Sequence, residues 1–304
     1  MNKFHTCTTF ALAALLTGSV LAPSLFAEPP VPPRPPQRVP GTEMGIDQLP
    51  NDKLDWLLDA KFGMFIHWGL YSGVGKGEWY MEQNGILPDA YRKYAYPESG
   101  DAYFDAADYD PAKWASLAKD AGMKWMCLTT RHPGGWGYNT DANVKGHVMS
   151  RDTLIRYLAN CTVRDMVLLV NVAPDRHGVI PDVQQKPLRE MGAWLEITGA
   201  AIYGTRGGPW QPKDREFGYC YKGNTLYVHL LNTYKGDTFT LPPLGTLKVQ
   251  KISDVFTGKP LTYAAADDAI TISGLDRTAS PADTIIAVTC DAPVESIWPD
   301  AAGH

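Results

Sequence analysis

Histidine, tryptophan and glutamate side chains gather at and just after the end of one short apolar run, and they suit a ligand that carries hydroxyl groups and a ring. His67 and Trp68 end the apolar run 63–68, and Glu78 and Trp79 come next in a glycine-rich stretch. An imidazole or a carboxylate can hydrogen-bond hydroxyl groups, and an indole can pack against a sugar ring. Two structural alternatives stay open, a histidine satisfied by backbone carbonyls and a carboxylate on the surface.

These side chains need rigid elements behind them, and the sequence predicts a parallel sheet. Apolar runs at 63–68, 125–130 and 166–170 predict buried strands, with amphipathic helical segments between them. That alternation is typical of a sheet covered by helices. The polar residues at the predicted strand ends are His67, Trp68, Thr129, Thr130, Arg131, His132 and Asn171. In a (β/α)₈ barrel, the TIM fold, this end of the strands carries the active site.

Capping residues predict where the helices begin. Asp110 is a predicted N-cap because its side chain can accept a hydrogen bond from a free backbone N–H, and Pro111 suits the first helical position. Ser150 is a second predicted N-cap. A further helix is predicted after Pro181, where apolar residues recur at spacings of three and four.

The carboxyl-terminal third of the chain has a different pattern. Short apolar segments recur from residue 216 to residue 289, and Lys222-Gly223-Asn224 is a turn signal between the first two of them. Residues 211–304 are therefore predicted to form a small β-sandwich, with a structural role. The part before it, residues 51–210, is the predicted barrel-type domain.

The first fifty residues carry targeting signals. Residues 1–27 combine Lys3 with an apolar stretch and small residues near Ala27, which predicts a secretory signal peptide. Residues 28–50 begin with a proline-rich run and are predicted to be a stiff linker. We therefore expect an exported protein, periplasmic or secreted.

Charge and composition exclude several classes of function. The net charge is −5, from 28 Lys and Arg against 33 Asp and Glu, and the chain has no basic block, which argues against nucleic-acid binding. No apolar run after residue 27 is long enough to span a membrane. The cysteine spacings fit no zinc pattern, so no metal site is predicted. Cys127, within an apolar run, is predicted to be a buried free thiol.

Several segments, taken in order, resemble a known family of enzymes. KFGMFIHWGLYS at 61–72, EWYM at 78–81 and AGMKWMCLTTRH at 121–132 are similar to the opening of glycoside hydrolase family 29, the α-L-fucosidases. Residues 136–141, 151–180 and 188–206 are similar to the end of the catalytic barrel of that family.

The resemblance implies a mechanism and a set of binding residues. It implies a retaining hydrolysis of fucosides in which one carboxylate attacks the anomeric carbon and a second carboxyl group acts as acid and then as base, without metal or cofactor. His67, Glu78, Trp79 and His132 match positions that bind the hydroxyl groups and ring of L-fucose in the family. Trp68 lies in a matching motif, without an assigned contact.

One departure from the family concerns the catalytic residues themselves. After Arg131-His132 the chain continues directly with Pro133-Gly134, and the family's strand with a Trp-Phe-Asp-Gly-like motif, which carries the nucleophile, has no counterpart. Residues 51–204 number 154, whereas a complete barrel needs about 250. The sequence therefore predicts an incomplete (β/α)₈ barrel, α/β in class, followed by the β-sandwich, and no catalytic residue is assigned.

Three hypotheses about function follow from these observations. The first is an exported α-L-fucosidase that has lost nearly all hydrolysis, because loss of a nucleophile removes most of the catalytic effect. The second is a non-catalytic protein that binds L-fucose or a fucosylated glycan. The third is a deletion product without a function of its own, which would be poorly soluble because strands next to the gap expose their edges.

Overall fold

The computed structural model describes residues 52–76, 79–91, 93, 104–129, 148–266 and 269–297. All of them belong to one compact unit, residues 38–304. The predicted signal peptide 1–27 and the linker 28–50 lie outside the described residues. None of the described helices combines the length and the apolar character of a membrane span.

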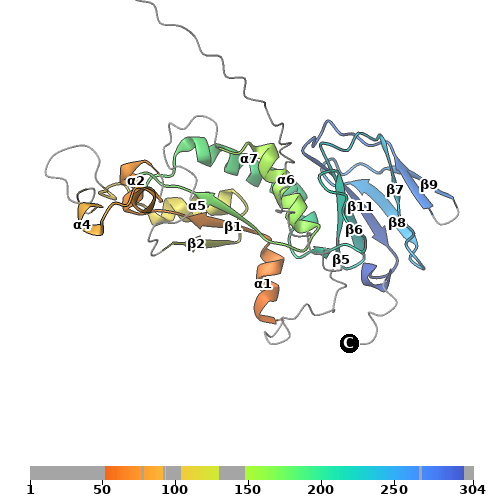
Figure 1. Ribbon diagram of the computed structural model, residues 1–304. Coiled ribbons are helices and arrows are strands. Elements are labelled where there is room, and N and C mark those ends of the chain that lie inside the picture. The colour runs from red at the N-terminus through yellow and green to blue at the C-terminus, as the bar shows by residue number, and fades with distance from the viewer. Residues whose placement is uncertain are drawn as a thin grey trace, which may run out of the picture. The chain divides into compact units, whose positions relative to one another are not determined.

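A three-stranded parallel sheet forms the amino-terminal part of this unit (Figure 1). Its central strand is β1, Phe62–Ile66, which pairs with β2, Trp125–Leu128, on one side and with β3, Leu168–Val172, on the other. The principal helices around it are α1 Asp52–Ala60, α5 Pro111–Asp120, α6 Arg151–Thr162 and α7 Asp182–Thr198. The shorter helices are α2 Leu70–Val74, α3 Tyr80–Gln83, α4 Pro88–Tyr91 and the 3₁₀ turns η2 Gly199–Ala201 and η3 Val294–Ile297.

The predicted helix caps are confirmed. The carboxylate of Asp110 accepts hydrogen bonds from the backbone N–H groups of Ala112 and Lys113 at the start of α5. The hydroxyl of Ser150 accepts from the N–H of Thr153 at the start of α6. These caps act within a few residues, so local sequence is sufficient to predict them.

The two faces of the parallel sheet differ in burial. Phe62, Met64 and Ile66 of β1 are buried in a core with residues of α5, α6 and α7, so the helices cover this face. The opposite face carries Cys127 of β2 and Leu169 of β3, and both side chains are exposed. Alternate residues of a strand point to opposite faces, so this face includes Phe65 and Asn171 as well.

Several details of the strand predictions are wrong. The strand β1 ends at Ile66 and β2 ends at Leu128, and not at residues 68 and 130. The third strand begins at Leu168 and not at residue 166, because Met166 N–H bonds to Cys161 O and closes the end of α6. Asn171 therefore lies within β3. Cys127 is a free thiol, as predicted, but it is exposed and not buried. Met126 and Leu128 are also 40% and 45% exposed, since β2 pairs with β1 alone among the described strands.

The carboxyl-terminal part contains two antiparallel sheets that share an apolar core. The five-stranded sheet has the order β4-β5-β6-β11-β8 and the three-stranded sheet the order β7-β10-β9. The strands are β4 Arg206–Gly207, β5 Phe217–Lys222, β6 Thr225–Leu231, β7 Thr238–Leu241, β8 Val249–Asp254, β9 Thr262–Ala266, β10 Ala269–Ser273 and β11 Asp283–Cys290. The turn predicted at Lys222-Gly223-Asn224 joins β5 to β6, with Gly223 at a φ of 58°.

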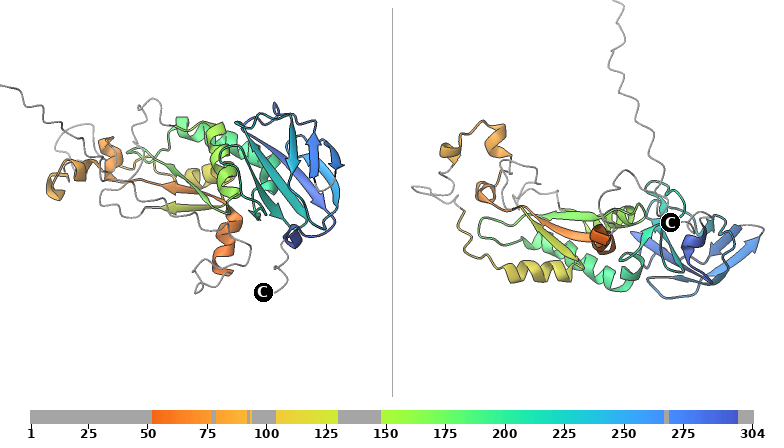
Figure 2. Two further views of the ribbon diagram at one scale, coloured as in Figure 1. Left: turned by 45° about the vertical axis from the view of Figure 1, so that its right-hand side comes forward. Right: turned by 90° about the horizontal axis from the view of Figure 1, so that it is seen from below.

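The outer face of the five-stranded sheet packs against the helices (Figure 2). Cys220, Tyr227 and Ile285 belong to the same core cluster as Leu154 and Leu158 of α6. Trp194 of α7 donates from Nε1 to Oγ of Ser280 over 3.0 Å. The helices α6 and α7 therefore contact both the parallel sheet and the five-stranded sheet.

Candidate functional site

The imidazole of His67 is held by a side chain of a neighbouring strand. Its backbone N–H continues the pairing of β1 with β3 by bonding to Val172 O at 3.1 Å. Nδ1 of His67 lies 2.6 Å from Oδ1 of Asn171. Because an amide oxygen only accepts, Nδ1 carries the hydrogen of this bond. His67 is buried, with the ring of Phe65 edge-on at 4.3 Å.

Asn171 was not among the site residues predicted from the sequence. It belongs to the polar positions at the strand ends, and the only signal was a single amide within the apolar run Leu168–Val172. Pairing of Phe65 with Asn171 in the parallel ladder brings the amide next to the residue that follows β1. A contact between residues this far apart in the chain needs the tertiary fold to be seen.

Trp68 serves internal packing. Its Nε1 donates to the backbone oxygen of Asp175 at 2.8 Å. Its ring stacks on Tyr109 with centroids 4.9 Å apart, and it meets the edge of Trp114 at 5.1 Å. An aromatic cluster therefore fixes the loop after β3 against the segment before α5.

A hydrogen-bonded pair of side chains closes the same loop. Nδ1 of His177 lies 2.8 Å from Oδ1 of Asp105, and Nε of Arg176 donates to Nε2 of His177 at 3.0 Å. A hydrogen bond from the N–H of Ala107 and the nearby His177 hold the pKa of Asp105 below its ordinary value. Asp105 is therefore ionised at neutral pH, and it is already bonded within the protein.

Asp175 caps a turn. Its Oδ1 accepts from the backbone N–H groups of His177 and Val179, each at 2.9 Å. Asp105 accepts from Ala107 N–H in a similar turn. Both carboxylates thus stabilise loops through hydrogen bonds from backbone N–H groups.

Two of the four predicted binding residues lie within the described part of the chain. His67 follows β1, and Trp79 is half-buried and stands directly before α3, where its carbonyl accepts from Gln83 N–H at 2.9 Å. Glu78 and His132 lie outside the described residues. The proposed roles of all four in sugar binding stay predictions.

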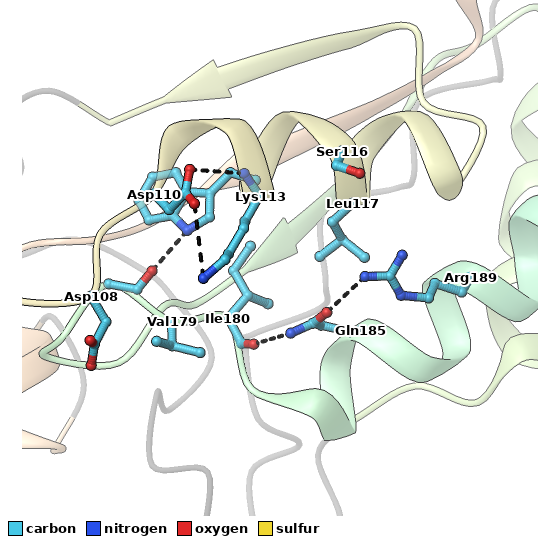
Figure 3. Close-up of a pocket in the computed structure, with 11 residues that line it drawn as sticks. Asp108, Asp110, Lys113, Ser116, Leu117, Val179, Ile180, Gln185 and Arg189 are labelled. Carbon is cyan, nitrogen blue, oxygen red and sulfur yellow. Dashed lines mark hydrogen bonds and ion pairs between the residues drawn. The ribbon is translucent and has the colours of Figure 1, made fainter.

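A separate pocket of about 180 Å³ lies between the start of α5 and the start of α7 (Figure 3). Several of its polar side chains bond to one another or to the backbone. Gln185 donates to Ile180 O at 2.6 Å and accepts from Arg189 at 3.0 Å, while Asp110 caps α5. Neither His67 nor Trp79 lines it. These groups stabilise the helix packing, and the pocket is not the predicted sugar site.

No cluster of three or more His, Cys, Asp or Glu side chains suited to a metal ion occurs within the described ranges. The four cysteines of these ranges, Cys127, Cys161, Cys220 and Cys290, are free thiols.

The comparisons with known proteins all point to one family. The family model for α-L-fucosidase matches residues 41–136 and 133–200, two segments that meet at residues 133–136. A plasma α-L-fucosidase of Rattus norvegicus is 27% identical over 150 residues, 47% of this chain and 32% of its own length. An α-L-fucosidase of Branchiostoma floridae is 30% identical over 155 residues, 50% of this chain and 32% of its own. The chain thus spans about a third of the length of these relatives.

Solved structures agree at the level of the fold. The α-L-fucosidase isoenzyme 1 from Paenibacillus thiaminolyticus has a TM-score of 0.66 at 17% identity, covering 79% of this chain and 99% of that one. The Thermotoga maritima α-fucosidase in complex with fucose has a TM-score of 0.57 at 17% identity, covering 77% and 96%.

Proposed function

Because the chain belongs to the α-L-fucosidase family, we propose that it is an exported member that recognises fucosylated glycans and hydrolyses them at a negligible rate. The observation that carries this proposal is the family match in two segments, which meet at residues 133–136. This is where the sequence passes from His132 to Pro133 without the strand that carries the nucleophile in the family. We propose that the block between the two matched segments is missing.

The arrangement of strands supports an incomplete barrel. The described residues form three parallel strands in the order β2-β1-β3, where a complete barrel has eight. Cys127 and Leu169 are exposed on the sheet face opposite the helices, which is the interior face of a closed barrel. The proposal extends to residues 51–210 as the partial barrel domain and residues 211–304 as a β-sandwich domain.

The missing block explains why hydrolysis should be negligible. A retaining glycosidase needs a nucleophilic carboxylate and an acid/base carboxyl group about 5–5.5 Å apart. Among the described residues, Asp105 and Asp175 lie near the loop after β3, and each accepts hydrogen bonds from backbone N–H groups of its own turn. Loss of a nucleophile reduces kcat by several orders of magnitude in enzymes whose catalytic residues act together.

The hydrolysis test uses a chromogenic fucoside. We expect the purified protein to release no more 4-nitrophenol from 4-nitrophenyl α-L-fucoside than a buffer blank does. The His67→Ala variant, prepared in parallel, distinguishes a contaminating enzyme from turnover by this chain. Turnover that persists through purification and disappears in the variant contradicts the proposal of negligible hydrolysis.

A second candidate function is binding of L-fucose without catalysis. It is favoured by the contact of His67 with Asn171, which orients an imidazole at the end of β1 although no attacking carboxylate is assigned. His67, Glu78, Trp79 and His132 are the proposed contacts of the sugar. Calorimetry with millimolar L-fucose tests this function, and absence of heat removes it. Any heat observed should disappear in Trp79→Ala and persist in the control Trp56→Ala, whose side chain is exposed.

Export rests on the sequence of residues 1–27, which has the pattern of a secretory signal peptide. Expression of the full chain in a bacterium with fractionation of the cell tests it. We expect a shortened product outside the cytoplasm, and an unshortened cytoplasmic product contradicts export.

A further inference from the structure

A buried line of titratable side chains crosses the face of the five-stranded sheet that packs on the helices. Cys220 lies on β5, His229 on β6 and Asp283 on β11. In the ladder, His229 pairs with Gly218 and Ile285, so Cys220 and Asp283 are its diagonal neighbours on the same face. Cys220 and Asp283 are 0% exposed and His229 is 1% exposed.

The contacts of these side chains form one chain of hydrogen bonds. Nδ1 of His229 lies 2.7 Å from Oδ2 of Asp283. Nε2 of His229 lies 3.3 Å from Sγ of Cys220. The thiol of Cys220 donates to the backbone oxygen of Ala201 in η2 over 3.2 Å. This series of hydrogen bonds therefore runs from the central strands of the sheet to the turn that follows α7.

The hydrogen bonds that satisfy all of these partners at once favour a doubly protonated ring. A carboxylate oxygen accepts, so Nδ1 carries a hydrogen. The thiol hydrogen is directed at Ala201 O, and the sulfur then accepts from a hydrogen on Nε2. A ring that donates from both nitrogens is an imidazolium. The neutral alternative, in which the thiol donates to Nε2, leaves Ala201 O without this donor and Asp283 without a cationic ring beside it.

The other ionisable groups near this line also need to be considered. Arg277 interacts electrostatically with Asp283, and its guanidinium donates to Leu231 O over 2.5 Å and lies over the ring of Tyr234. Tyr227 faces Cys220. On the side of the helices, the polar group that contacts Cys220 is the backbone oxygen of Ala201. Asp283 is thus the carboxylate that neutralises the imidazolium, with Arg277 as a more remote cation.

We propose that His229 is a buried imidazolium that links the five-stranded sheet to η2, and that this link is lost when the ring deprotonates at alkaline pH. A neutral ring keeps Nδ1–H on Asp283 and accepts the thiol hydrogen of Cys220 on Nε2, so the thiol must give up Ala201 O and with it the bond to η2. Ala201 O is then left without this donor at the contact between sheet and helices, and the buried Asp283 is left without a cationic ring beside it.

The electrostatic balance agrees with this geometry. Burial lowers the pKa of His229, but Asp283 and Cys220 together raise it by more than burial lowers it. The folded-state pKa therefore lies well above 6.5. A raised pKa means that the stabilisation is fully present below about pH 6.5, the unfolded value. It is lost as the pH rises through the folded-state pKa.

Thermal unfolding of the full chain between about pH 6 and pH 10 tests the proposal. We expect the Tm of the wild type to fall on the alkaline side by at least about 3 °C more than that of His229→Gln, which has no titrating ring. The matched control is His177→Gln, which removes the half-exposed histidine that pairs with Asp105 and should keep the alkaline loss. Equal alkaline loss in wild type and His229→Gln overturns the proposal.

A second measurement does not require the variant to fold. Nitrogen-15 spectra of imidazole-labelled full chain at about pH 8.5 should contain one ring with both nitrogens protonated, because an exposed histidine is neutral two pH units above its pKa. That signal should persist in Cys127→Ser, a variant of the exposed thiol. Spectra in which every imidazole is neutral overturn the proposal.

Discussion

Asn171 of β3 holds the imidazole of His67, with 2.6 Å between Oδ1 and Nδ1. The two residues come from different segments of the family match, His67 from residues 41–136 and Asn171 from residues 133–200. The bond from Trp68 to Asp175 O and the pair Asp105–His177 join the same two segments. The parts on either side of the junction therefore assemble into one structure.

The role of Asn171 as a positioning residue can be tested by truncation. We expect Asn171→Ala to weaken L-fucose binding by about tenfold, since a lost hydrogen bond costs on the order of 1 kcal/mol and leaves His67 free to rotate. Calorimetry with L-fucose measures the change. Asn84→Ala removes an exposed amide that bonds only within its own helical turn and is the control. Unchanged affinity in Asn171→Ala, together with loss of binding in His67→Ala, would show that His67 acts without Asn171.

Local signals in the sequence were sufficient to predict most helices and strands. Features that depend on contacts between distant residues could not be predicted in this way. Asp110 and Ser150 cap helices through hydrogen bonds that span two or three residues, so the adjacent sequence is sufficient to predict their roles. The strand β9, Thr262–Ala266, was missed because all five residues are exposed and no apolar alternation marks it.

The candidate site shows the same limit. His67 was selected from its place at the end of an apolar run, whereas its partner Asn171 becomes visible only through the pairing of β1 with β3. Exposure of Cys127 was mispredicted because an apolar run indicates burial only when neighbouring strands cover both faces. His229 and Asp283 are 54 residues apart, and nothing in either local sequence indicates their contact.

A buried ion pair at the start of β1 should be important for stability. Nζ of Lys61 lies 2.6 Å from Oδ1 of Asp165, and the two side chains are 0% and 17% exposed. Asp165→Asn leaves Lys61 as a buried charge without its counterion, and we expect a loss of about 3 kcal/mol in the free energy of unfolding. Asparagine suits the positive φ of 53° at this position, so backbone strain does not contribute.

Denaturant unfolding measures this loss. The control is Lys113→Met, which removes an exposed ammonium that lies 3.9 Å from the carboxylate of Asp110. Its effect should stay within about 0.5 kcal/mol. A loss in Asp165→Asn as small as that of the control would contradict a contribution of the buried pair.

The pair Asp105–His177 predicts a dependence on acidic pH. The pKa of Asp105 is lowered by the hydrogen bond from Ala107 N–H and by His177. A lowered pKa gives a stabilisation that is present above the unfolded value of about 3.8–3.9 and is lost as the pH falls through the folded value. Asp105→Asn should therefore be less stable than the wild type at neutral pH, and the difference should shrink toward pH 3. Urea unfolding at both pH values measures this difference, with the exposed Asp237→Asn as control. A difference that does not change with pH would exclude the charge of Asp105 as its cause.

Reactivity of Cys127 distinguishes an open sheet from a closed barrel. Cys127 is exposed on the face of β2 opposite the helices, whereas Cys220 and Cys290 are 0% exposed. Burial also raises the pKa of Cys161, which slows its reaction as a thiolate. In the protein from which residues 1–27, and with them Cys7, have been removed, we expect one thiol to react rapidly under native conditions with a maleimide or with a disulfide reagent, and the Cys127→Ser variant should lack this rapid phase. In a barrel closed by eight strands this face is filled by side chains and Cys127 would be protected. Absence of a rapid phase in the wild type, or its persistence in Cys127→Ser, would refute the open sheet.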